Sequence, residues 1–162
     1  MPATPVPGLL AAKALEIAAS YLGVTEHPPH SNRGPEVDAF LRSVGLNPEA
    51  KSYPWCAAMV SYCVEQAAEA LHMPLRFRRT ASCARMAELN YRLEISGPEP
   101  GAVFIHLNPD HTGHAGFVTQ VLPGGLFRDI SGNSDANGSR TGGSVCSNVR
   151  PISYAAHFLR LA

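Results

Sequence analysis

A change of hydrophobic period near the middle of the chain constrains its fold more than any other feature. Before the segment Pro98-Glu99-Pro100-Gly101, apolar residues recur at helical spacing, and after it short apolar runs alternate with turn residues. Helices followed by strands predict an α+β domain, with N-terminal helices packed on one face of a C-terminal antiparallel β-sheet.

Glycine and proline residues mark where the predicted elements begin and end. Gly23 and Gly45 are natural helix stops, and Pro54 fits the first turn of a helix because its missing N–H costs nothing there. The sequence predicts helices over residues 10–22, 37–44, 54–71 and 82–89. Strands are predicted over residues 102–107, 115–122, 126–130, 144–150 and 155–161.

Length and charge narrow the classes of protein and partner. A chain of 162 residues suits one domain, 1–162, whose proline-rich residues 1–8 we expect to be flexible. Lys plus Arg balance Asp plus Glu, 13 against 13, which argues against a nucleic-acid partner, and we expect a monomer.

No run of the sequence approaches the roughly 20 apolar residues of a membrane span. Lys13 and Glu16 interrupt the first apolar stretch, so we expect no classical signal peptide, synthesis in the cytoplasm and no membrane partner.

The four cysteines are too few and too scattered for a disulfide framework, so we expect them to be reduced. Cys56 follows Tyr53-Pro54-Trp55 and falls in the first turn of a predicted helix, where free N–H groups and the helix dipole stabilise a thiolate. We therefore expect Cys56 to be a nucleophile. Cys63, two turns deeper, is expected in the core, and Cys83 and Cys146 are expected to be structural.

A histidine is needed as the base for such a nucleophile. His114, in Gly113-His114-Ala115-Gly116, stands where a turn passes into a strand, so its backbone would be fixed and its ring aimed. His27, His106 and His111 have weaker contexts. His111 and His114 could also form half of a zinc site, but no matching pair follows, and we expect neither metal nor cofactor.

A third polar group should orient the histidine. Strand alternation would place Asp129, Ser131 and Asn133 on one face toward His114, and Asn133 is the candidate. A plain turn role for Asn133 is an equally open interpretation. The backbone N–H of Cys56 and the side chain of Tyr53 or Ser52 are candidates for an oxyanion hole.

Several segments, in this order and spacing, resemble the cysteine, histidine-dependent amidohydrolase/peptidase (CHAP) family of papain-like peptidoglycan hydrolases. They are Tyr21-Leu22-Gly23-Val24, residues 31–38, Trp55-Cys56-Ala57-Ala58-Met59-Val60-Ser61, residues 98–104, Gly113-His114-Ala115-Gly116-Phe117-Val118 and Gly132-Asn133. The resemblance implies a papain-like α+β fold in which Cys56 is the nucleophile, His114 the base and Asn133 its polar partner. Ser131 is a departure, because many relatives have glutamate there, and Asp129 could substitute.

The resemblance also implies a function. We expect a bacteriolytic amidase or endopeptidase that cleaves an amide in or next to the peptidoglycan stem peptide through a thioester. Trp55, Tyr53, Asn32 and Ser131 are the expected substrate contacts, although the loop 26–35 could equally be a solvated connector. Action on the cell wall would require non-classical delivery or lysis, with a possible delivery or immunity protein as partner. The alternatives are a weak or inactive cell-wall peptide-binding module, and a papain-like deamidase or acyl transferase acting on protein.

Overall fold

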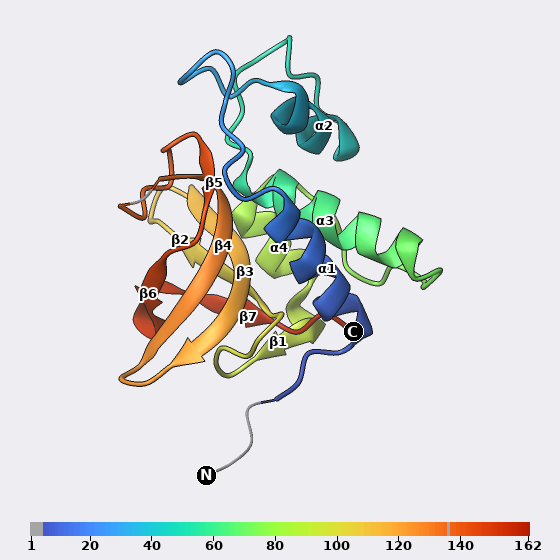
Figure 1. Ribbon diagram of the computed structural model, residues 1–162, viewed down its shortest axis with the longest axis vertical. Coiled ribbons are helices and arrows are strands. Elements are labelled where there is room, and N and C mark those ends of the chain that lie inside the picture. The colour runs from blue at the N-terminus through green and yellow to red at the C-terminus, as the bar shows by residue number, and fades with distance from the viewer. Residues whose placement is uncertain (1–4, 136) are drawn as a thin grey trace.

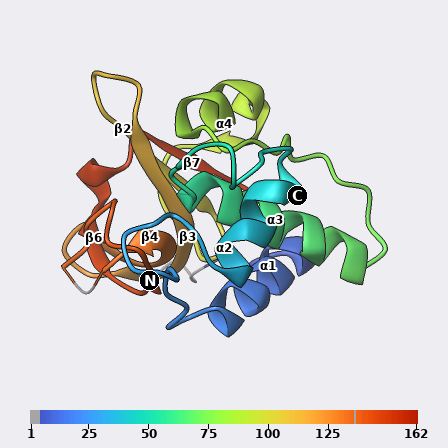
Figure 2. The same ribbon diagram turned by 90° about the horizontal axis from the view of Figure 1, so that it is seen from above.

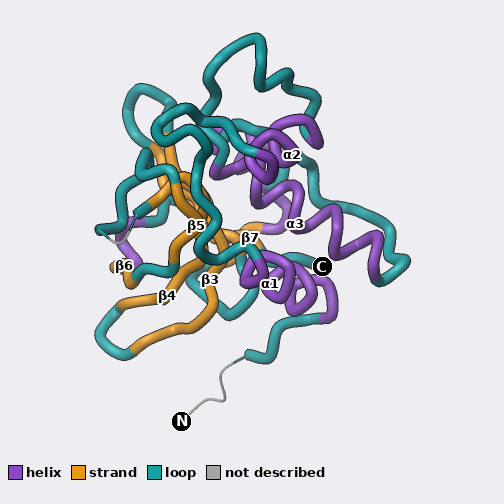
Figure 3. Tube along the Cα trace, turned by 45° about the horizontal axis from the view of Figure 1, so that its top comes forward, coloured by secondary structure: helices purple, strands orange, loops and turns teal. Residues whose placement is uncertain are grey.

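The computed structural model describes residues 5–135 and 137–162. Figure 1 shows helices gathered on one side of a curled sheet, and Figure 3 separates the two layers by colour. Four of the eight N-terminal residues expected to be flexible, 1–4, lie outside the described residues. No described helix is long and apolar enough to cross a membrane.

The described residues form four α-helices in the first layer, of which the first three were predicted from their hydrophobic period and the fourth, over 82–89, from a weaker signal. They are α1 (Leu9–Ser20), α2 (Pro35–Ser43), α3 (Cys56–Ala70) and α4 (Cys83–Leu89), with short 3₁₀ turns at Tyr91–Leu93 and Ile152–Tyr154. Helix α3 begins two residues later than predicted, because Trp55 is its N-cap and Pro54 precedes it. Cys56 is therefore the first helical residue.

The second layer is one antiparallel sheet, which confirms the α+β class. Its strand order is β1-β7-β2-β3-β4-β5, and β6 also pairs with β4. The bounds are β1 (Glu94–Ile95), β2 (Val103–Leu107), β3 (Gly113–Leu122), β4 (Leu126–Ser134), β5 (Ser144–Cys146), β6 (Val149–Pro151) and β7 (His157–Leu159).

The strands differ from the sequence prediction in several places, and of the strand predicted over 155–161 only His157–Leu159 forms, as β7. β1 was not predicted, β3 begins early enough to include His114, and β4 continues to Ser134. The single strand predicted over 144–150 is two strands, β5 and β6, which pair with opposite ends of β4. Between them the N–H of Asn148 turns to the carboxylate of Asp129, 2.7 Å away, and this contact interrupts the ladder.

Two cores lie on opposite faces of the sheet. The larger one is formed by the helices and the strand residues that face them, such as Ala115 and Phe117. Figure 2 shows from above that α1, α2, α3 and α4 all lie on this side. The smaller core, on the other face, contains Phe104, Val118 and Phe127. Because side chains alternate along a strand, His114 belongs to the face of Val118.

The N-terminal end of α3 lies against the ends of β3 and β4. Paired residues between these strands run from Leu122–Leu126 to Phe117–Ile130. Beyond that point the ring of Trp55 fits against Gly132, where an added Cβ would lie only 2.5 Å from it. Glycine is needed here for this close approach, which carries Cys56 to the side of β3.

Candidate active site

Cys56 sits where a helix can stabilise a negative sulfur. It is the first residue of the 15-residue helix α3, and no side chain among the described residues caps that helix end. The free N–H groups of the first turn and the helix dipole therefore favour an anion at this position. The side chain is only 3% exposed, but it forms part of the wall of a surface cavity.

The surroundings of Cys56 hold the pKa of its thiol well below the usual value. The largest cause is a hydrogen bond from the thiol of Cys83, and burial acts in the opposite direction. The imidazole of His114 and the backbone N–H of Ala115 lower the pKa further. Two residues of β3 and one of α4 thus act on one sulfur, which is favoured as thiolate.

Cys83 is the site residue that the sequence did not reveal. Its Sγ lies 3.8 Å from the Sγ of Cys56, and it is the first residue of α4 as Cys56 is of α3. The neighbouring Cys56 and burial raise the pKa of Cys83, so Cys83 stays protonated and donates its S–H to the thiolate. The expectation of a purely structural Cys83 is wrong in this respect. Its one sequence signal was Ser82, a helix N-cap.

His114 lies within β3 and has no exposed surface. Neither ring nitrogen is aligned for a hydrogen bond with any described residue. The ring is nevertheless close enough to Cys56 to affect its thiol, and resting sites often tighten such contacts only when substrate binds. An imidazole without a competing partner is free to accept a proton from the thiol.

The other histidines near this end of the sheet are placed differently. His106 pairs with His114 across β2 and β3, but its Nδ1 lies 2.7 Å from the Tyr154 carbonyl and its Nε2 3.0 Å from Asn108. Its ring also stacks on Tyr154, with the centroids 4.1 Å apart. These contacts occupy both ring nitrogens of His106, and His111 and His27 are exposed in loops.

The three candidates for orienting His114 lie at alternate positions along β4. Continuing the Phe117–Ile130 register puts Ser131 opposite Gly116, where an added Cβ would lie 2.7 Å from that of Ser131. Asn133 comes two residues later in β4, beyond the last β3–β4 residue pair, and its amide makes no hydrogen bond with the His114 ring. Asn133 is 3% exposed with φ at 55°, a left-handed conformation that asparagine tolerates.

Asp129 is too distant to replace the missing glutamate by direct contact. It pairs with Val118, four residues beyond His114, which corresponds to about 13 Å along a strand. Its carboxylate is already bound by Arg150, 2.6 Å away, and receives the hydroxyl of Ser131 at 3.3 Å. Asp129 is thus engaged by Arg150 and Ser131 and makes no hydrogen bond with His114.

The cavity beside Cys56 has a volume of about 200 Å³. Both thiols line it, and the loops around Thr112 and Arg140 complete its wall. The Arg140 guanidinium donates to the Thr112 hydroxyl at 3.3 Å, which joins the loop before β3 to the loop before β5. The space can hold one substrate side chain next to the nucleophile.

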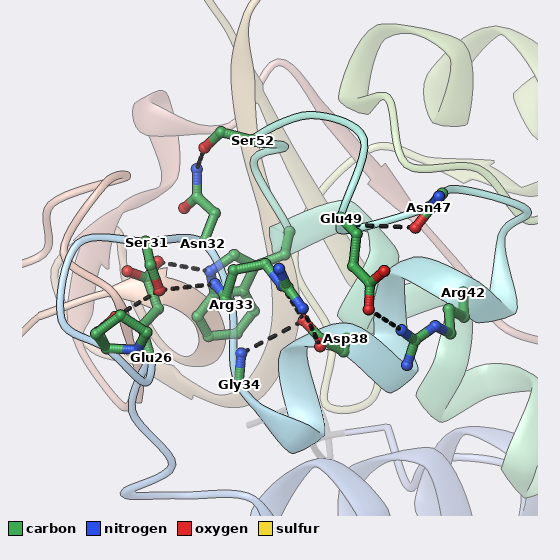
Figure 4. A network of polar contacts seen from close by, with 12 residues as sticks. Glu26, Ser31, Asn32, Arg33, Gly34, Asp38, Arg42, Asn47, Glu49 and Ser52 are labelled. Carbon is green, nitrogen blue, oxygen red and sulfur yellow. Dashed lines mark hydrogen bonds and ion pairs between the residues drawn. The ribbon is translucent and has the colours of Figure 1, made fainter.

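The loop 26–35 is tied to the segment that leads into α3, as Figure 4 shows. The Asn32 amide donates to the Ser52 hydroxyl at 2.8 Å, and the Arg33 guanidinium grips Asp38 with two contacts of 2.9 Å. Ser52 is exposed, and its hydroxyl oxygen accepts the hydrogen bond from Asn32. Asn32, which contacts Ser52, is itself partly exposed.

Two of the expected substrate contacts are placed in the interior. Trp55 has no exposed surface, and its indole N–H donates to the buried Glu26 at 2.9 Å. A buried ring cannot line a groove, so Trp55 holds the start of α3 in place instead. Ser131 is also buried, at 1% exposure, so its contacts are with the protein. Tyr53 is half-buried against the larger core.

Comparisons with protein-family models, with curated proteins and with solved structures find no match to this chain.

Proposed function

We propose that this protein is a cysteine-dependent amidohydrolase or peptidase with a papain-like arrangement of its catalytic groups. The observation that carries the proposal is the placement of Cys56, at an uncapped helix N-terminus, beside His114 and in the wall of a cavity. A lowered thiol pKa, a neighbouring base and an accessible cavity are the three requirements of a cysteine nucleophile.

The chemistry begins with the sulfur of Cys56 and the ring of His114. Transfer of the thiol proton to His114 leaves a thiolate, which attacks the carbonyl carbon of a bound amide. The developing oxyanion meets the N–H groups at the start of α3, with the Ser52 hydroxyl as a further donor. Protonated His114 then gives its proton to the amine as the C–N bond breaks.

Hydrolysis of the thioester completes the cycle. Water enters the cavity, gives a proton to His114 and attacks the acyl carbon, and the Cys56 sulfur leaves. Asn133, near the end of β4, is the proposed orienting group, because an amide can hold the imidazole in one tautomer without carrying charge. Every step uses groups of this chain and water.

The proposed substrate is an amide in or next to the stem peptide of peptidoglycan. Support for this substrate comes from the resemblance to CHAP hydrolases in the segments around Cys56, His114 and Asn133. A narrow cavity beside the sulfur is compatible with the short side chains of such peptides. The protein would act on the cell wall as a monomer after delivery or lysis.

The direct test is release of new amines from purified peptidoglycan. Wild-type protein should release them, and Cys56→Ala should abolish release while the circular dichroism spectrum and melting temperature stay unchanged. Cys63→Ala is the matched control, because Cys63 lies deeper in the same helix, and burial raises its pKa to about 12. That variant should retain release. Undiminished release by Cys56→Ala would end the proposal.

A peptide-binding module without activity predicts a different pattern. It would bind peptidoglycan without releasing amines, and Cys56→Ala would bind equally well. A protein deamidase or acyl transferase would instead act on glutamine in a protein substrate such as casein and leave peptidoglycan intact. Running both substrates with wild type and Cys56→Ala separates these outcomes in one experiment.

A further inference from the structure

The thiol of Cys83 is close to Cys56 in a way that catalysis of amide hydrolysis does not require. The two sulfurs are 3.8 Å apart, and each belongs to the first residue of a helix. Both residues are nearly buried, at 3% and 8% exposure, yet both line the same cavity. A small oxidant that enters the cavity reaches both sulfurs.

The two thiols have unequal character. Cys56 is the one that touches His114 and the Ala115 N–H, whereas Cys83 is held protonated beside it. This is the arrangement of an attacking thiolate and a resolving thiol, since oxidants react with thiolates and a neighbouring thiol traps the product. A disulfide needs the sulfurs at about 2.05 Å, so they must approach each other from 3.8 Å.

We propose that Cys56 and Cys83 form a reversible disulfide when the protein meets a peroxide, and that this bond switches the nucleophile off and protects it. The inference concerns the thiol pair itself and does not depend on which amide the protein cleaves. The bond removes the thiolate that catalysis would need, and reduction restores it.

The chemistry balances with hydrogen peroxide as the two-electron oxidant. The Cys56 thiolate attacks one peroxide oxygen, so that an S–O bond forms, the O–O bond breaks and hydroxide leaves. The Cys83 sulfur then attacks the sulfur of the Cys56 sulfenic acid, an S–S bond forms and the S–O bond breaks. The departing hydroxide takes the Cys83 proton. In sum, two thiols and one peroxide give one disulfide and two waters.

The other two cysteines provide internal controls. Cys63 lies two turns further along α3 with no exposed surface, and burial raises its pKa to about 12. Cys146 lies on β5, partly exposed, and burial and nearby Asp135 raise its pKa. Neither is favoured as a thiolate. Oxidation should therefore be confined to Cys56 and Cys83.

The experiment treats the reduced protein with hydrogen peroxide and counts thiols after unfolding. The count should fall from four to two, the intact mass should drop by two hydrogens, and peptide mapping should find Cys56 joined to Cys83. Dithiothreitol should reverse all three. In Cys83→Ser and Cys83→Ala, peroxide should instead add oxygen to Cys56 as sulfinic acid, which dithiothreitol does not remove.

A variant with Cys63→Ser and Cys146→Ser should react with peroxide as wild type does. Its two remaining thiols, those of Cys56 and Cys83, should disappear together. Four surviving thiols, a disulfide that includes Cys63 or Cys146, or full recovery of the Cys83 variants by dithiothreitol would overturn the inference. These readouts need no substrate. If the disulfide forms but the protein releases no amines, the inference stands and the proposed function fails. If the protein releases amines but forms no disulfide, the proposed function stands and the inference fails.

Discussion

At the scale of single residues, the site depends on which side chains surround one sulfur. The pKa of Cys56 is lowered by Cys83, His114 and the Ala115 N–H together, and these groups come from two elements, α4 and β3. For Cys63, in the same helix, burial is the cause that acts on the thiol, and it raises the pKa. Burial by itself suppresses a thiolate, so the neighbours decide the charge.

Removing the Cys83 thiol should raise the pKa of Cys56. The hydrogen bond from Cys83 is the largest cause of the lowering, and Cys83→Ala deletes it. A hydrogen bond donated to the thiolate stabilises its charged form, so its loss should raise the pKa of Cys56. Ultraviolet thiolate absorbance, titrated against Cys56→Ala as blank, measures it. Cys63→Ala should leave the curve unchanged, and an unshifted curve for Cys83→Ala would refute this role.

At the scale of elements, the periodic segments were predictable, and the contacts between them were not. The first three helices and the change to strands follow from the spacing of apolar residues, whereas α4 had only a weak signal in the sequence. Cys56 at a helix start follows from Pro54 and the helical period after it. The pairing of Cys56 with Cys83 joins residues 27 apart in sequence, and no local pattern carries that information. The extension of β4 to Ser134 was missed because Gly132 and Asn133 are typical turn residues.

A substitution at Gly132 tests how closely β4 packs against the start of α3. An added Cβ would lie 2.5 Å from the Trp55 ring and 2.8 Å from the Met59 sulfur. Gly132→Ala should therefore push the start of α3 away, destabilise the fold by roughly 1–3 kcal/mol and slow Cys56 alkylation. Gly97→Ala is the control, because its added Cβ has no atom within 4 Å. Equal urea midpoints for the two variants would contradict this packing.

The Asp129–Arg150 pair tests the second face of the sheet. Both side chains are at most 5% exposed, and the guanidinium lies over the rings of Tyr154 and Phe104. Arg150→Met leaves a buried carboxylate without its cation, which should cost about 3–5 kcal/mol in urea unfolding. Adding Asp129→Asn should recover part of that loss. If Arg150→Met were as stable as wild type, the ion pair would contribute nothing to the free energy of unfolding.

At the scale of the whole molecule, ion pairs hold one loop and the C-terminal segment against the helices and the sheet. Arg33 and Asp38 hold the loop 26–35 against α2, and Arg160 near the C-terminus grips Glu99 at 2.6 Å, just before β2. Hydrogen bonds from these arginines lower the pKa of both carboxyl groups. The ion pairs that hold this loop and the C-terminal segment therefore require ionised carboxylates.

These shifts predict weaker folding in acid. A carboxyl group whose folded pKa is depressed stabilises the fold above its unfolded pKa, about 4, and the stabilisation is lost as pH falls through the folded pKa. The free energy of unfolding should thus decline below about pH 4. Because the pairs are partly exposed, the effect should be modest. In Asp38→Asn with Glu99→Gln the urea midpoint should fall less between pH 5 and pH 3, and an equally steep fall would exclude these groups.

The most direct test of the site is how fast Cys56 reacts with iodoacetamide at pH 6, measured by peptide mass spectrometry in folded and in urea-unfolded protein. An ordinary thiol with a pKa near about 8.5 is almost fully protonated at that pH. The folded protein should label at Cys56 at least about 10-fold faster than the unfolded chain, because only the fold stabilises the thiolate. Labelling of folded Cys56 at the unfolded rate or below it would contradict the assignment of Cys56 as an activated nucleophile.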